Sequence, residues 1–177
     1  HVEMFTPKLA ESVHFFVNVL GLTESGREGD SVYLRGWDDY EFHTLKLTGS
    51  HTSGTGHVAF RTHSPQALER RAKVLEARGW GDGWHDGDLG HGKTYRARTP
   101  DGQPVELYYE TRWYEAPPEL KPALKNQAMR YPARGCNVRR IDHLNLLVRD
   151  VAKTRDFFHS GLGMRLTEQI VLDDGTE

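Results

Sequence analysis

The chain has 177 residues, of which 37% are hydrophobic and 27% charged, and its formal net charge is −2. These values are typical of a globular protein, and they exclude the concentrated positive charge that a nucleic-acid-binding surface needs. Apolar runs stay far below the ~20 residues that cross a bilayer, so we expect no membrane segment and a cytoplasmic location, which a single cysteine also favours.

The chain opens with strand character. His1 to Phe5 is predicted to be extended, and a helical stretch follows that ends near Leu22. Strands are predicted next at residues 31–35 and 43–47, because hydrophobic and polar residues alternate well in the second segment. These elements form a first unit of strand, helix and about three strands.

A second unit of the same kind follows. It begins with a strand at His57, and its helix is expected to start at Ser64, which can cap a helix that has proline in its first turn. Gly79 is expected to end this helix. Four residues should face the core: Leu68, Ala72, Leu75 and Ala77. Further strands are predicted at residues 81–89, 94–99 and 104–109.

The sequence then changes character. Residues 111–140 are interrupted by prolines and are predicted to be a connector, with a short helix at residues 119–129. A new unit begins near Arg140, with a strand that carries His143, a helix, a second strand at residues 166–172 and a turn at 173–175. The predicted organisation is a first domain, a connector and an incomplete second domain, at residues 1–110, 111–140 and 141–177 respectively. We expect both ends to be cut from a longer protein.

Two internal repeats support this organisation. At an offset of 142 residues, and without gaps, His1 corresponds to His143 and Phe15–Phe16 to Phe157–Phe158. A weaker repeat inside the first domain, at an offset of 56, pairs His1 with His57. Self-similarity of this kind indicates a duplicated structural unit.

The paired units predict an α+β fold, in which βαβββ modules form a cupped mixed sheet and a second copy is truncated. This pattern resembles the vicinal oxygen chelate superfamily of glyoxalases and bleomycin resistance proteins. The 142-residue repeat and the connector are similar to the two-domain extradiol ring-cleavage dioxygenases of the catechol 2,3-dioxygenase type. Three segments carry the resemblance: Gly56–Phe60, Thr99–Tyr108 and Ile141–Leu146.

The resemblance implies an enzyme that cleaves catechol-type diols with O2 at a single Fe(II), or in some members Mn(II), held by two histidines and a glutamate. Such ligands suit a divalent ion of this kind and leave positions open for the reactants. His143 corresponds to the first ligand. The other two would lie beyond Glu177, so the fragment alone is expected to be inactive. On a strand, Asp142 would point away from the face that carries His143.

The first domain has an equivalent set of residues, His1, His57 and Glu106. Internal symmetry predicts that they converge in the cup, with Glu106 on the concave side because Val105 and Leu107 face the helices. Two interpretations remain open for this set. The residues are either inherited polar groups that hydrogen-bond to one another, or ligands of a divalent metal; in the family that the chain resembles, this domain usually carries none.

The remaining histidines receive less weight. His85 and His91 lie with Asp82, Asp86 and Asp88 in a glycine-rich stretch. This cluster could bind a metal ion, but we predict a mobile polar loop. His14 and His159 are expected on exposed faces of their helices.

An alternative function is a metal-independent small-ligand binding module of the bleomycin-resistance type. Residues 1–110 would suffice for it, so the additional copy at the 142-residue offset argues against it. A structural role for the first domain is compatible with the enzyme. The expected partners are a catechol-type small molecule, O2 and further copies of the chain, because unpaired sheet edges favour association; no nucleic-acid or membrane partner is expected.

Overall fold

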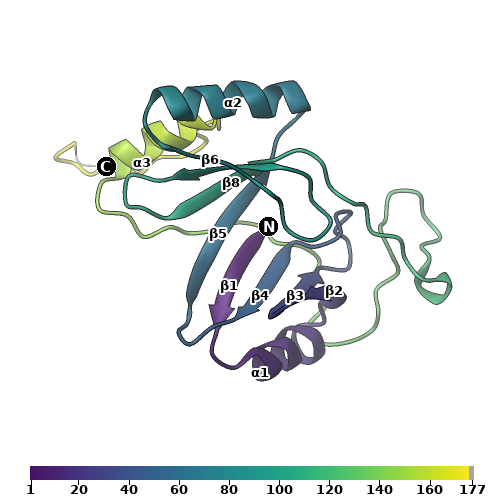
Figure 1. Cartoon of the computed structure of the whole chain (residues 1–177). Helices are drawn as coiled ribbons and strands as arrows, with labels where there is room; N and C mark the ends of the chain where they lie inside the picture. Colours follow the sequence, from purple (N-terminus) through teal and green to yellow (C-terminus); the bar gives the residue numbers. More distant parts are fainter. Residues whose placement is uncertain (176–177) are drawn as a thin grey trace.

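The computed structural model describes residues 1–175, which form one mixed sheet with helices on its outer face (Figure 1). The strand order is β2-β3-β4-β1-β5-β8-β7-β6. The strands are β1 (Val2–Thr6), β2 (Thr23–Glu28), β3 (Ser31–Arg35), β4 (Leu45–Gly49), β5 (Gly54–Arg61), β6 (Gly81–His85), β7 (Thr94–Arg98) and β8 (Pro104–Tyr108). The helices are α1 (Leu9–His14), η1 (Phe15–Val19), α2 (Pro65–Ala77), η2 (Pro118–Leu120), α3 (Val151–Asp156) and η3 (Phe157–Gly161).

Two equivalent halves meet at the centre of this sheet. β1 pairs with β4 in parallel, β5 pairs with β8 in parallel, and β1 and β5 are antiparallel neighbours. Each half therefore has the order strand, helix and three strands, which confirms the predicted α+β fold of paired βαβββ modules. β2 was missed, because Thr23–Glu28 is mostly polar and lies at the edge of the sheet, where burial imposes no alternation.

Helix α2 follows the prediction closely. Ser64 caps it by accepting a hydrogen bond from the backbone N–H of Ala67 at 3.1 Å. Gly79 lies just beyond its end with φ of +69°, a conformation that favours glycine. Of the residues predicted to face the core, Leu68, Ala72 and Leu75 are buried. The prediction was wrong for Ala77, which is exposed at the last turn of the helix.

The sheet separates an apolar layer from a polar one. Val105 and Leu107 pack with Leu75 of α2 in one core cluster. Glu106, between them, points the other way and is 2% exposed. The helices therefore cover one face, and the opposite concave face receives charged side chains at the centre of the sheet.

The second copy begins with the same helical geometry as the first. Shifted by 142 residues, the bounds of α1 and η1 become those of α3 and η3, including the change from α- to π-helical hydrogen bonding at the paired phenylalanines. Gly21 and Gly163 both have positive φ, +84° and +78°. The 142-residue repeat is thus a repeat of structure.

The helix of the second copy packs beside α2, as Figure 1 shows at the top of the molecule. Phe157 and Leu162 join the core cluster that contains Leu75. The rings of Phe157 and Trp80 lie 5.3 Å apart. The outer face of the first domain therefore covers part of the apolar face of the second-copy helix.

Three predicted elements are corrected. No strand forms around His143 or at residues 166–172 within the described part of the chain. A strand needs a partner for its backbone groups, and neither segment has one there. The helix predicted at residues 119–129 is reduced to the single turn of η2. The turn at residues 173–175 is confirmed.

The segment that links the two copies is fixed by cation contacts. Arg35 is fully buried, its guanidinium lies 3.7 Å from the ring of Tyr114, and Nη1 contacts Met129 Sδ at 2.9 Å. Asp38 accepts hydrogen bonds from Arg139 and Arg140 at 2.7 and 2.9 Å. The connector is therefore held against the sheet.

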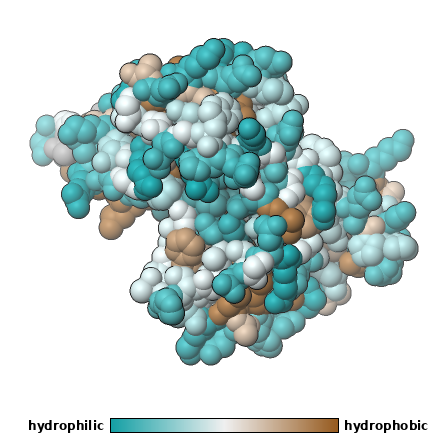
Figure 2. All heavy atoms as spheres, in the orientation of Figure 1, coloured by the Kyte–Doolittle hydropathy of each residue, from teal (hydrophilic) through white to brown (hydrophobic). Residues whose placement is uncertain are grey.

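Hydrophilic residues cover most of the face drawn in Figure 2, and its hydrophobic areas are separate from one another. Among the described residues, no helix has both the length and the apolar character needed to cross a membrane.

Candidate functional site

Charged residues, most of them buried or partly buried, gather on the concave face of the sheet. We call six of them the ion-pair cluster. They come from β1, β4, β5, β7, β8 and the loop after β6, and they are Glu3, Lys46, His57, Asp88, Arg96 and Glu106. Because the elements that carry them are far apart in the chain, only the folded sheet brings these charges together.

His57 lies at the centre of this cluster. Its Nδ1 donates to Glu3 Oε2 at 3.0 Å, and its Nε2 lies 3.3 Å from Asp88 Oδ2 and 3.7 Å from Glu106 Oε2. Nε2 also lies 2.8 Å from His1 Nε2. Burial by itself would lower the pKa of His57, but hydrogen bonds to Asp88 and Glu3, together with the charge of Glu106, raise it to about 9. His57 is therefore cationic at neutral pH.

The cluster balances its own charge. Lys46 Nζ bridges Glu3 Oε1 at 2.9 Å and Asp88 Oδ1 at 2.6 Å, and Arg96 Nε donates to Glu106 Oε1 at 2.6 Å. Burial opposes ionisation of Glu3, but hydrogen bonds from His57, Thr48 and Lys46 hold its pKa at about 2. The six members thus comprise three carboxylates and three cations, and each charge has a partner of opposite sign.

A second group, the histidine cluster, lies beside the first and comprises His1, His43 and His91. His1 stands at the head of β1, His43 just before β4, and His91 in the loop after β6. The rings of His43 and His91 stack with centroids 4.4 Å apart, and the ring of His1 lies 4.6 and 4.9 Å from them. Tyr108 stacks on His91 at 4.2 Å, and its hydroxyl donates to Glu41 at 2.6 Å.

The structure brings together the three residues expected in the first cup, in contacts that the sequence did not predict. His57 contacts both His1 and Glu106, but Glu106 is engaged by Arg96. Asp88 is the carboxylate that joins His1 and His57.

Asp88 and His91 were placed in a mobile loop, but their side chains turn into the cup. His91 forms a β-bridge with Thr111, which holds this loop against the sheet. Neither repeat marks these residues or His43. The signals available were the grouping of His91 and Asp88 in the glycine-rich stretch and the high number of histidines, ten in 177 residues.

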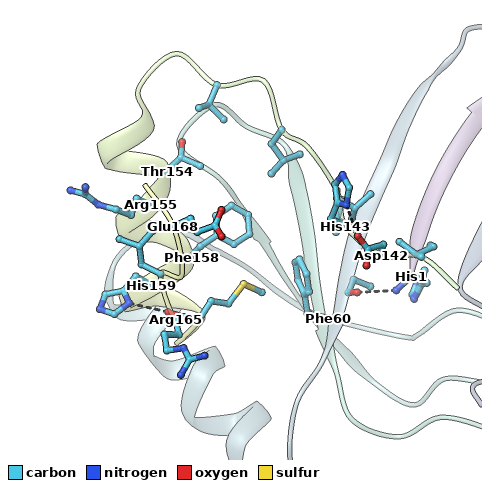
Figure 3. A pocket seen from close by; sticks show the side chains of 18 of the residues that line it. His1, Phe60, Asp142, His143, Thr154, Arg155, Phe158, His159, Arg165 and Glu168 are labelled. Carbon is cyan, nitrogen blue, oxygen red and sulfur yellow. Dashed lines mark hydrogen bonds and ion pairs between the residues drawn. The ribbon is translucent and has the colours of Figure 1, made fainter. Parts of the chain in front are cut away.

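His143 lies at a separate place, on the wall of a cavity of about 870 Å³ (Figure 3). Asp142 and His143 face Thr154, Arg155 and Phe158 of the second-copy helix across this cavity, as Figure 3 shows. The side chain of His143 is 71% exposed.

The immediate partner of His143 is Asp142. His143 Nδ1 lies 2.8 Å from Asp142 Oδ2. Asp142 was expected to point away from His143, because neighbouring side chains of a strand point to opposite faces. The segment is not a strand, so this alternation does not apply. A carboxylate that accepts from Nδ1 leaves the lone pair of Nε2 free, which is the usual orientation of a metal-binding histidine.

The raised pKa of His57 predicts the pH dependence of stability. Its pKa is about 6.5 in the unfolded chain and about 9 in the folded one, so the stabilisation is complete below pH 6.5 and is lost as the pH rises through 9. With chelator present, we expect the free energy of unfolding to fall by on the order of 3 kcal/mol between pH 6.5 and 10. Urea unfolding at a series of pH values measures this change.

His57→Gln is the matched variant for this measurement. Burial by itself would lower the pKa of Lys46, but hydrogen bonds and ion pairs with Asp88 and Glu3 raise it to about 12. Lys46 therefore does not titrate between pH 6.5 and 10. The variant should therefore show a much flatter profile between pH 6.5 and 10. An unchanged slope would assign the pH dependence to another group.

The chain was compared with known proteins. A family model described as the Glyoxalase/Bleomycin resistance protein/Dioxygenase superfamily matches residues 1–107 and 140–177. A protein named metapyrocatechase from Geobacillus stearothermophilus is 48% identical over 96% of this chain and 52% of its own length. A manganese-dependent 2,3-dihydroxybiphenyl 1,2-dioxygenase from Geobacillus genomosp. 3 is 37% identical, over 99% of this chain and 56% of its own.

The solved structures agree with the sequence matches. Homoprotocatechuate 2,3-dioxygenase from Brevibacterium fuscum, in complex with 3,4-dihydroxyphenylacetate, superimposes with a TM-score of 0.83 at 30% identity. This match covers 99% of the chain and 53% of the dioxygenase. The chain spans about half the length of the curated relatives that it matches.

Proposed function

The chain belongs to the glyoxalase/bleomycin resistance protein/dioxygenase superfamily, and from this premise we propose that it is the amino-terminal part of a metal-dependent extradiol dioxygenase. The whole enzyme cleaves catechol-type diols with O2. The observation that carries the proposal is the second copy. Residues 140–177 match the same family model as residues 1–107, and their helix reproduces the first one at an offset of 142 residues.

The proposed organisation has a complete first domain at residues 1–110, a connector at residues 111–140 and the start of the catalytic domain at residues 141–177. The two segments matched by the family model support this division, since the gap between them falls on the connector. The first domain supplies a sheet and the helix α2, on which the second copy packs.

The cavity beside His143 also supports an incomplete second copy. In the first domain, Val2 and Phe16 belong to one core cluster. Their counterparts at the 142-residue offset, Leu144 and Phe158, both line this cavity. We infer that further strands of a second sheet fill the space and bring the other metal ligands towards His143.

His143 is proposed as the first ligand of Fe(II) or Mn(II) in the second domain. Its Nδ1 is engaged by Asp142, so Nε2 is available, and the metal choice follows the relatives, one of which is named as manganese-dependent. The bound ion supplies the centre at which diol and dioxygen react. Asp142 holds the imidazole in one tautomer and one orientation.

The reaction that we propose is ring opening beside the diol. The carbon–carbon bond next to one hydroxyl-bearing carbon breaks, and both atoms of O2 enter the product, a hydroxy-semialdehyde acid. The alternative of a metal-independent binding module is not favoured, because the similarity to dioxygenases continues through the second copy. Homo-oligomers are proposed on the basis of the exposed sheet edges alone.

The activity is tested on a chain extended to the length of the relatives. The protein is loaded with Fe(II) or Mn(II) without oxygen and then mixed with catechol and O2. We expect a yellow product and one O2 consumed per catechol, and no turnover by the 177-residue chain. A folded, metal-loaded extended protein that consumes no O2, or that cleaves between the two hydroxyls, would contradict the proposal.

A further inference from the structure

We propose that His1, His43 and His91 form a second metal site, in the first domain, for a divalent transition-metal ion such as zinc or cobalt. Ligand nitrogens of these three side chains all lie within 4.8 Å of one another. They come from β1, from the segment before β4 and from the loop after β6. The site is distinct from the proposed ligand His143 and does not depend on the activity of the whole enzyme.

The first argument is that five of the six ring nitrogens in this cluster lack a hydrogen-bond partner. Both nitrogens of His43, both of His91 and Nδ1 of His1 are buried without a hydrogen bond. The side chains of His1 and His91 are 0% exposed, and His43 as a residue is 0% exposed. A buried polar atom that lacks a partner is costly, so five of them in one cluster indicate a ligand.

The second argument is that the surroundings hold the rings in place. The rings of His43 and His91 stack with centroids 4.4 Å apart, and Tyr108 stacks on His91 at 4.2 Å. His1 Nε2 lies 3.0 Å from Asp88 Oδ2 and 2.8 Å from His57 Nε2, whereas its Nδ1 has no hydrogen bond. Side chains that orient a histidine from outside the site in this way are usual around metal ions.

The adjacent ion-pair cluster is the less suitable location. His1, His57 and Asp88 also lie within ligand distance of one another. Asp88 is already bonded to Lys46 at 2.6 Å, and His57 is held cationic between Glu3 and Asp88. A metal ion there would have to displace these ion pairs and face the charge of Lys46, whereas His43 and His91 have no hydrogen bond to give up.

The donor set defines the class of ion. Three imidazoles are a common zinc set that leaves a fourth position for water or a small anion, and nitrogen donors favour the later first-row ions. Nitrogens around such an ion are about 3.3 Å apart, since each bond is about 2.0–2.1 Å. Since the ligand atoms lie within 4.8 Å of one another, the rings need to close by at most about 1.5 Å. Glu41, 3.8 Å from His91 Nε2, and Asp88 provide negative charge on either side.

The test uses the full 177-residue chain, stripped with chelator and titrated with Co(II). We expect one Co(II) per chain, with the intense visible spectrum of a four-coordinate ion, and a rise in melting temperature of about 5–10 °C at saturation. His43→Gln and His91→Gln should each abolish stoichiometric binding, while their far-UV circular dichroism without metal remains that of the parent chain.

His143→Gln and His57→Gln are the control variants. They change the cavity that His143 lines and the ion-pair cluster, but none of the three proposed ligands. Both should still bind one Co(II). The proposal would be overturned if either control variant failed to bind Co(II) while His43→Gln still bound it. It would also be overturned if the parent chain bound no Co(II). If a variant fails to fold, anomalous scattering at the cobalt edge on the parent chain decides, and a peak anywhere other than between the three imidazoles contradicts the site.

Discussion

Replacing His143 with glutamine in the length-extended protein is expected to abolish iron binding and to lower kcat/KM for catechol by well over 100-fold. His143 has only one partner in the described structure, Asp142, and it is the proposed metal ligand nearest to the start of the second copy. Loss of a residue that merely orients a ligand typically costs 10–100-fold, so loss of the ligand itself should cost more. Iron content and O2 uptake, measured on the same sample, test this.

Asp142→Asn should give the smaller loss of 10–100-fold, because an amide orients the imidazole less well than a carboxylate does. His14→Gln is the matched control, since His14 is an exposed helix histidine whose side chain hydrogen-bonds to Asn18 one turn away. It should retain full iron content and activity. Normal iron content and activity in His143→Gln would remove His143 from the metal site.

Internal repetition predicted more of the structure than any local pattern did. The 142-residue offset placed the second-copy helix correctly, because both copies repeat the same apolar spacing up to the paired phenylalanines. The cap at Ser64 and the stop at Gly79 were also predictable, since each depends on residues close in sequence.

The errors share a physical cause, which is dependence on distant partners. A strand around His143 needs neighbouring strands, and the described chain provides none there, so the local β pattern was not sufficient. His43, Asp88 and His91 enter the cup because loops far apart in sequence close over the sheet. No periodicity encodes that closure, so the candidate set of the first domain was only partly predictable.

Replacing Phe157 with alanine in the 177-residue chain is expected to lower the free energy of unfolding by about 3–5 kcal/mol. Phe157 is 0% exposed and packs with Leu75 of α2 and with Trp80, whose ring lies 5.3 Å away. The void would lie between the second-copy helix and α2, where Gly161 already approaches the ring of Trp80 closely. Urea unfolding followed by circular dichroism measures the loss.

The repeat supplies the matched control. Phe15 is the counterpart of Phe157 in the first copy, at the same position of the same α-to-π helix, but it is 47% exposed. Phe15→Ala should therefore cost less than about 1 kcal/mol, since little buried contact is lost. Because the two substitutions are chemically identical and locally equivalent, their difference isolates the packing of the second copy on the first domain. Equal losses would mean that the second-copy helix is not part of the cooperative fold, and that α2 is stable without it.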